Sequence, residues 1–307
     1  MPHTLRIGIQ IEHVDPFWVQ VREVMWRRAQ TLSAELIEIN IQESHALSAD
    51  EQAEVVEDLI VQELDALLCN TYPPSLLGHI LDRGIPIIYV SEIALQRPRF
   101  TSRVGLYDAA RMLGVFLHER LAGHGRLLIV GGHSQNEDTG QSRLDGFAAG
   151  LAGQPGYVFH YVPCEWNSAT IGALVAQYLG EHPDLQLDAI FGLSDSLALT
   201  ARDTAQAHGR IGPQTLILGI NGDPLALAAI ADGSMTATVE TDVEDIATQA
   251  INLAHQAARG QPTPAHFQHR LHLISAENVA DASMRRLLSL ATLPTHLIEI
   301  MVVAAAA

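Results

Sequence analysis

Apolar runs and amphipathic stretches alternate along almost the whole chain. The first apolar run, residues 5–11, precedes residues 16–33, in which apolar side chains recur at the spacing of one helix face. Each later apolar run is likewise short and is followed by a helical pattern. A strand followed by a helix that returns the chain to the same edge is the building unit of a parallel sheet. The pattern therefore predicts an α/β fold of the doubly wound type.

The alternation of predicted strands and helices is interrupted near residue 104, and this interruption divides the predicted elements into two halves. A loop rich in Arg and Pro, residues 96–103, separates them. The predicted strands occupy residues 5–11, 36–41, 66–69, 85–90, 104–105, 127–130, 158–162, 189–191, 216–220, 236–240 and 266–273. The predicted helices occupy residues 16–33, 49–63, 74–83, 109–121, 139–151, 168–179, 196–208, 225–231, 243–258 and 276–290. We therefore expect two Rossmann-like lobes with parallel sheets.

The last predicted elements exceed what the second lobe needs to complete its sheet. We therefore expect the chain to return to the first lobe after about residue 241 and to cross back for the final strand, so that three crossings form a hinge. Two lobes joined in this way predict a ligand cleft between them. The expected division is 1–103 with 242–267 for the N-terminal lobe, 104–241 with 268–290 for the C-terminal lobe, and 291–307 as a tail.

Charge and composition exclude several classes of function. The formal net charge is −17, and all 18 basic residues are arginine. Binding to nucleic acid is not expected, because that affinity comes from clustered positive charge. The absence of lysine excludes Schiff-base chemistry and a phosphate-loop lysine. Cys69 and Cys164 are too few for a disulfide framework or a zinc site, so we expect both to be small buried residues.

The amino terminus carries no recognisable export signal, since Met1 to Thr4 lead directly into the first strand. The sequence as written therefore predicts a cytoplasmic protein. A periplasmic or extracytoplasmic location is the alternative if a signal was removed. No apolar run approaches the roughly 20 residues of a membrane helix, so direct membrane insertion is not expected.

The corner Asp15-Pro16-Phe17-Trp18 joins the first strand to the first helix. Asp15 can cap the helix through its carboxylate, and Pro16 suits the first helical position. Ligands bind at the carboxyl ends of strands in parallel α/β sheets, which is where Phe17 and Trp18 lie. Phe17 also belongs to the apolar stripe of the helix. Both readings of the aromatic pair, as core and as a stacking platform for a ligand, therefore stay open.

Further motifs follow in a fixed order along the chain. The apolar strand 85–90 ends in Ser91-Glu92, Arg143 opens an Arg-x-x-Gly-Phe element, and Trp166 follows the next strand. Ser194-Asp195, Asn221-Gly222 and Thr241 each follow or end a later strand. In their order and spacing these motifs, with the aromatic corner, resemble the type I periplasmic binding protein superfamily. The resemblance spans roughly residues 5 to 275 and is greatest to the sugar-binding branch around the ribose-binding proteins.

The resemblance implies a ligand site built from both lobes. The implied ligand-binding residues are Asp15, Phe17, Trp18, Ser91, Glu92, Arg143, Trp166, Ser194, Asp195, Asn221 and Thr241. Aromatic rings would cover the apolar faces of a sugar, while charged and amide groups would bind its hydroxyls. Ribose-type binders usually carry Asp-Arg where this chain has Ser91-Glu92. That difference counts against ribose and other simple aldopentoses.

Each implied residue has a plain structural alternative. Arg143 could be a surface residue and Trp166 a core residue, while Ser194 and Asp195 could only cap the following helix. Asn221 could serve its turn alone. Further polar residues at strand ends form a second, weaker set: Glu12, His13, Asn70, Tyr72, Glu92, His133 and Glu240.

These observations favour a non-enzymatic binder of a small neutral sugar or polyol. The sequence contains no nucleophile elbow, phosphate loop or metal-binding helix motif, so a sugar-modifying enzyme is the least favoured alternative, and neither a cofactor nor a metal is expected. The superfamily also includes the effector-binding cores of lactose-repressor-like regulators, but this chain begins with the first strand instead of a DNA-binding domain. Two partners stay open: the permease of an ABC importer, or a downstream signalling domain such as a histidine kinase, into which the helix 276–290 could continue.

Overall fold

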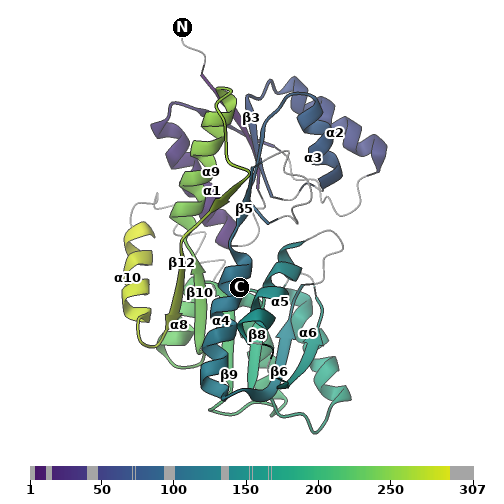
Figure 1. The fold of residues 1–307 in the computed structure, drawn as a ribbon, viewed down its shortest axis with the longest axis vertical. Coiled ribbons are helices and arrows are strands. Elements are labelled where there is room, and N and C mark those ends of the chain that lie inside the picture. Colours follow the sequence, from purple (N-terminus) through teal and green to yellow (C-terminus); the bar gives the residue numbers. More distant parts are fainter. Residues whose placement is uncertain are drawn as a thin grey trace. The chain divides into compact units, whose positions relative to one another are not determined.

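The computed structural model describes residues 4–11, 16–39, 48–70, 72, 74–92, 101–132, 138–151, 153, 155–164, 166 and 168–290. Glu12, His13, Asp15 and His133 lie outside these residues. The described chain forms two units, 4–104 with 242–270 and 105–241 with 271–290. Each unit contains one six-stranded sheet (Figure 1). The predicted α/β class with two lobes is confirmed.

In unit 1 every pair of neighbouring strands is parallel, and the strand order is β11-β5-β4-β3-β1-β2. The strands are β1 (Arg6–Gln10), β2 (Glu35–Glu38), β3 (Ala66–Cys69), β4 (Ile87–Tyr89), β5 (Thr101–Val104) and β11 (His266–Gln268). The helices are α1 (Pro16–Thr31), α2 (Ala49–Val61), α3 (Pro74–Asp82) and α9 (Val243–Ala258). Helix α1 begins at Pro16, as the sequence predicts.

Alternation along the strands divides the core of unit 1 between the two faces of its sheet. Ile7 and Leu68 belong to the cluster that includes the buried residues of α1 and α9. Leu67 and Cys69 belong to the cluster that includes the buried residues of α2 and α3. Successive side chains of a strand point to opposite faces, so both faces are covered by helices. This is why the strands are apolar at almost every position.

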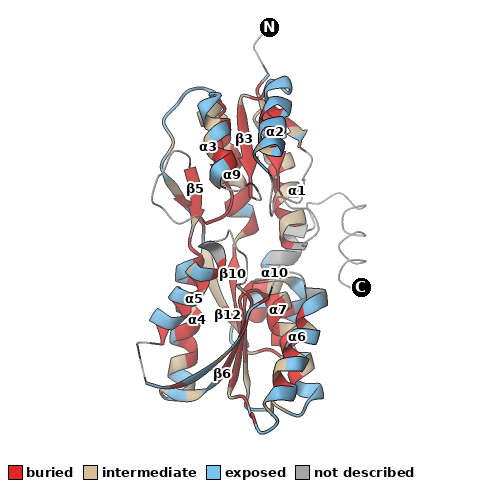
Figure 2. Cartoon of the chain, turned by 90° about the vertical axis from the view of Figure 1, so that its right-hand side faces the viewer, coloured by how far each residue is buried: buried red, intermediate tan, exposed pale blue. Residues whose placement is uncertain are grey.

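In unit 2 the strand order is β12-β10-β9-β8-β6-β7, and all pairs are parallel except β10 with β12. The strands are β6 (His124–Val130), β7 (Gly156–Val162), β8 (Ala189–Gly192), β9 (Leu216–Asn221), β10 (Ala237–Thr241) and β12 (Leu271–Ser275). The helices are α4 (Leu106–Leu121), α5 (Asp138–Gly150), α6 (Ser168–Glu181), α7 (Asp195–Ala207), α8 (Pro224–Ala231) and α10 (Val279–Leu290). Figure 2 shows buried strands between the pair α4–α5 and the pair α6–α7.

Two boundaries that the sequence predicted are wrong. The run 266–273 is not one strand, because its first part pairs with β5 in unit 1 and its second part pairs with β10 in unit 2. The expected lobe boundary between residues 267 and 268 already fell inside this run, but hydrophobicity alone did not divide the run into two strands. The strand expected at 104–105 begins at Thr101 and takes the end of the predicted loop 96–103. Cys69 and Cys164 are both buried, as predicted.

Three glycines allow the backbones of α4 and α5 to approach closely. A Cβ atom at Gly146 would collide with the carbonyl oxygen of Tyr107, and Gly114 and Gly150 face each other across the same contact. Backbone carbonyls cannot move aside without disturbing a whole helix. The two helices therefore depend on small residues at this contact.

We expect Gly146→Ala to lower the free energy of unfolding of unit 2 by about 1–3 kcal/mol, because an added methyl group overpacks the helix contact. Gly180 lies in α6 and has nothing within 4 Å of an added Cβ. Gly180→Ala is the matched control and should leave stability unchanged or raise it by up to about 1 kcal/mol. Urea unfolding followed by circular dichroism measures both variants. Equal stability of the two variants would contradict the proposed packing.

Candidate functional site

Buried polar side chains gather where the strands of unit 1 end. Gln10 ends β1, Asn70 follows β3, and Ser91 and Glu92 lie just beyond β4; all four are 8% exposed or less. The carboxyl ends of parallel strands meet at one edge of the sheet, so these groups share that edge. A sheet edge with a purely structural role could be built from apolar side chains at a lower cost in free energy, because each buried polar group requires a hydrogen-bond partner.

The aromatic corner places its two rings differently. Phe17 is 4% exposed and belongs to the core cluster of α1 and α9. Trp18 is partly buried and packs against that cluster, with its ring edge-to-face to Phe17 at a centroid distance of 5.0 Å and an angle of 78°. Phe17 therefore serves the core, and Trp18 has the more accessible ring. A ligand-stacking role for the pair stays a prediction.

Arg103 is a functional candidate that the sequence analysis missed. It lies on β5, is 2% exposed, and its Cζ atom lies 5.7 Å from the centroid of the Trp18 ring. A guanidinium over an indole face gains about 2 kcal/mol or more when desolvated. Sequence patterns placed this arginine at the end of a polar loop, where exposure is the ordinary expectation. Only the pairing of β5 with β4 and β11 brings it inside.

His269 is buried near Arg103, after the end of β11. It is 6% exposed. Burial and, to a lesser extent, the positive charge of Arg103 lower the pKa of His269 to about 2, against the opposing effect of a hydrogen bond with the backbone of Val104. The imidazole is therefore neutral at physiological pH. In the sequence, this position falls inside the predicted strand 266–273, where nothing indicated a role in binding.

In unit 2, Arg143 and Trp166 form a second pair of the same kind. Arg143 lies in α5, is 7% exposed, and its Cζ atom lies 4.6 Å from the centroid of the Trp166 ring. Trp166 is partly buried and packs against the core of unit 2. The structure thus brings together two residues that the family resemblance implied, and it shows that Arg143 is not a surface residue.

The buried carboxylate of Asp195 forms hydrogen bonds near the strand ends of unit 2. The side chain is completely buried; Oδ1 accepts a hydrogen bond from the Thr238 hydroxyl at 2.7 Å, and Oδ2 accepts one from the Asp223 backbone N–H at 2.8 Å. Ser194 is the N-cap of α7, and its Oγ accepts the Leu197 N–H at 3.4 Å. These contacts support the capping alternative for Ser194 and a bracing role for Asp195.

The turn that Asp195 holds carries Asn221. This residue ends β9 with φ of 136°, is 8% exposed, and precedes Gly222 at φ of 74°. A positive φ is strained for a residue other than glycine, so surrounding contacts must impose it. The Thr238 hydroxyl provides one of them by accepting the Gly222 N–H at 3.2 Å.

Two other polar residues end the next strand, β10. Thr241 is completely buried, and its hydroxyl has no hydrogen-bond partner among the residues that the structure describes. Glu240 is almost buried and forms an ion pair with Arg285 of α10 at 3.2 Å. Ligand binding by Thr241 therefore stays a prediction, whereas the carboxylate of Glu240 already has a structural partner in Arg285.

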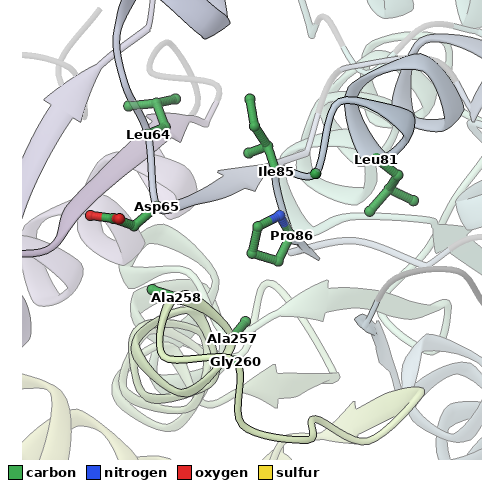
Figure 3. Close-up of a pocket in the computed structure, with 9 residues that line it drawn as sticks. Leu64, Asp65, Leu81, Ile85, Pro86, Ala257, Ala258 and Gly260 are labelled. Carbon is green, nitrogen blue, oxygen red and sulfur yellow. The ribbon is translucent and has the colours of Figure 1, made fainter.

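A cavity of about 520 Å³ lies elsewhere in unit 1, between the end of α9 and the residues that precede β3 and β4 (Figure 3). Its walls comprise Leu64, Asp65, Leu81, Gly84, Ile85, Pro86, Ala257, Ala258 and Gly260. The lining is polar and apolar in similar measure. The Asp65 carboxylate already accepts the Arg6 N–H at 2.7 Å. The cavity lies at the amino ends of the strands, so it contains none of the predicted ligand-binding residues.

Within the described part of the chain, no group of three or more His, Cys, Asp or Glu side chains could hold a metal ion. None of the described helices is long and apolar enough to cross a membrane.

Comparison with known proteins matches the chain to binding proteins, both by sequence and by structure. Residues 11–262 match the family described as periplasmic binding protein domain. The ribose import binding protein of Bacillus subtilis is 25% identical over 261 residues, covering 83% of this chain and 82% of that protein. A Bacillus halodurans ABC transporter solute binding protein, solved with bound myo-inositol, aligns with a TM-score of 0.78 at 21% identity, covering 92% of this chain and 98% of its own. The Caulobacter myo-inositol binding protein aligns at 0.80 and 18% identity, covering 92% and 97%.

We expect Asp195→Asn to lower the free energy of unfolding by about 1–3 kcal/mol, because an amide can accept only one of the two buried hydrogen bonds well. Asp203, in the same helix with a side chain 65% exposed, provides the matched control Asp203→Asn. The control should change stability by less than about 0.5 kcal/mol. Chemical denaturation measures both, and equal losses would contradict the bracing role.

Acid should destabilise the protein partly through His269. The folded pKa lies below the unfolded value of about 6.5, so the unfolded chain binds the extra proton, and the stability present above pH 6.5 declines as the pH falls below it. We expect His269→Gln to make the fall in unfolding free energy shallower, by up to about 1.4 kcal/mol per pH unit. His79→Gln, at an exposed position of α3, is the control. Parallel pH profiles for wild type and His269→Gln would contradict a buried neutral imidazole.

Proposed function

The chain belongs to the periplasmic binding protein domain family, and from this premise we propose that it binds a small neutral sugar or polyol as the solute receptor of an ABC importer. The ligand is bound and released unchanged. The proposed ligand-contacting residues include Trp18, Arg143 and Trp166.

The contact between Arg143 and Trp166 carries this proposal. A sugar or cyclitol ring has apolar C–H faces and a rim of hydroxyls. An indole offers a flat apolar surface, and a guanidinium beside it offers charge-assisted donors for the rim. Both groups already touch, with the arginine buried, so little side-chain freedom remains to be lost on binding.

Within this ligand class, cyclitols and hexoses are favoured over ribose. Two structural neighbours were solved with myo-inositol, although at 21% and 18% identity these likenesses support the fold more than the ligand. Ser91-Glu92 stands where ribose-type binders usually carry Asp-Arg. A carboxylate and a hydroxyl at that edge accept hydrogen bonds from ligand hydroxyls instead of donating a guanidinium fork.

The proposed partner is the permease of an importer, and the proposed location is periplasmic or extracytoplasmic. The family and the ribose import relative support this pair over the signalling alternative. An input domain of a sensor would use the same ligand chemistry with a different partner.

A thermal-shift screen over pentoses, hexoses, cyclitols and sugar alcohols tests the ligand class. A ligand that binds only the folded chain raises the melting temperature by mass action. We expect the largest shift with a cyclitol or hexose. A response only to amino acids or nucleosides would contradict the proposal.

Arg143→Met should weaken binding of the best ligand of that screen at least about tenfold, because a charge-assisted hydrogen bond contributes about 1.5–3 kcal/mol. Arg126 is the matched control, since its side chain is 46% exposed at the start of β6 and pairs loosely with Asp188. Arg126→Met should bind as wild type does. Titration calorimetry measures both, and unchanged affinity of Arg143→Met would remove Arg143 from the site.

A further inference from the structure

Each unit contains one buried arginine whose guanidinium lies over a partly buried tryptophan. The sequence analysis and the family resemblance account for Arg143 over Trp166 in unit 2. Neither accounts for Arg103 over Trp18 in unit 1, although Arg103 is the more deeply buried of the two, at 2% exposure.

Strand register places Arg103 at the edge where the predicted site lies. Ser102 is in register with Tyr89, the last residue of β4, so Arg103 lies one position further toward the carboxyl edge. Ser91 and Glu92 leave β4 at this same edge. The neighbouring strand β5 therefore brings a guanidinium to the place where β4 has none.

His269 reaches the same edge from the other side of β5. Arg103 is in register with Phe267 of β11, two residues before His269. Arg103 is also one of the charges that lower the pKa of His269. A neutral imidazole offers one donor and one acceptor. The backbone of Val104 engages one ring nitrogen of His269, which leaves the other for a ligand hydroxyl.

We propose that Arg103 and His269 contact the ligand and set its specificity, by binding a pair of adjacent hydroxyls of a cyclic polyol. This inference rests on the proposed function and names the residues of unit 1 that recognise its ligand class. The guanidinium fork donates to two neighbouring hydroxyl oxygens, and the imidazole accepts from one of these hydroxyls. The face of the guanidinium lies over the Trp18 ring. Its N–H donors therefore point outward in the plane of the guanidinium and not toward the ring.

The position of the Arg103 guanidinium differs from that of an arginine placed directly after β4. Arg103 enters from the adjacent strand, and His269 lies beyond it, so the ligand hydroxyls that it can reach are those nearest β5 and β11. A five-membered or six-membered ring with a free vicinal pair on that side fits this arrangement. A ligand that lacks one hydroxyl of the pair loses one charge-assisted hydrogen bond to Arg103, and such losses discriminate strongly.

The test is a double-mutant cycle between protein and ligand. Titration calorimetry compares wild type, Arg103→Lys, Arg103→Met and His269→Asn with myo-inositol and with its monodeoxy derivatives. We expect Arg103→Lys, which keeps the charge and loses the fork, to weaken myo-inositol binding about tenfold. We expect one monodeoxy derivative to bind wild type about tenfold more weakly than myo-inositol, and both ligands to bind Arg103→Met equally.

The controls separate contact from folding. Arg83→Met removes a positive charge from unit 1 at an exposed ion pair with Glu57, and its affinity should equal that of wild type. Where Arg103→Met does not fold, Arg103→Lys and His269→Asn decide, each after its urea unfolding curve shows a folded chain. Binding of myo-inositol by wild type with unchanged affinity in Arg103→Lys and His269→Asn overturns this inference and leaves the proposed function standing. A wild type that binds no sugar or polyol overturns the proposed function, and this inference with it.

Discussion

The cost of burying a guanidinium constrains both units of this protein. An arginine that loses its water must regain interactions of similar strength, or the fold loses several kcal/mol. In each unit an indole face contributes to meeting this requirement, Trp18 for Arg103 and Trp166 for Arg143. Arg103 lies on β5 and Arg143 lies in α5.

The surrounding structure holds these edges rigid. In unit 2 the carboxylate of Asp195 ties Thr238 of β10 to the turn that follows Asn221, and the strained backbone of Asn221 is kept in place by that network. The glycine contact of α4 with α5 fixes the helix that carries Arg143. In unit 1 the core around Phe17 anchors the start of α1, and therefore Trp18. A preorganised edge of this kind binds a small ligand with little further loss of entropy.

Hydrophobic periodicity was sufficient to predict the α/β class, most strands and helices, and the start of α1 at Pro16. It predicted residues 266–273 as one strand, although the expected lobe boundary after residue 267 fell inside this run, because an apolar run carries no information about its pairing partner. The same limitation explains why Arg103 and His269 were missed, since their burial follows from pairing of β5 with β4 and β11. Among the predicted site residues, Arg143 and Trp166 touch as a binding pair would. Asp195 instead has a bracing role that only its buried hydrogen bonds reveal, and Asp15 lies outside the described residues.

The effect of the two buried arginines on ligand affinity tests the central claim most directly. Titration calorimetry of the intact chain with myo-inositol should show a lower association constant for Arg103→Lys and for Arg143→Lys than for wild type. Unchanged association constants in both variants would contradict the account.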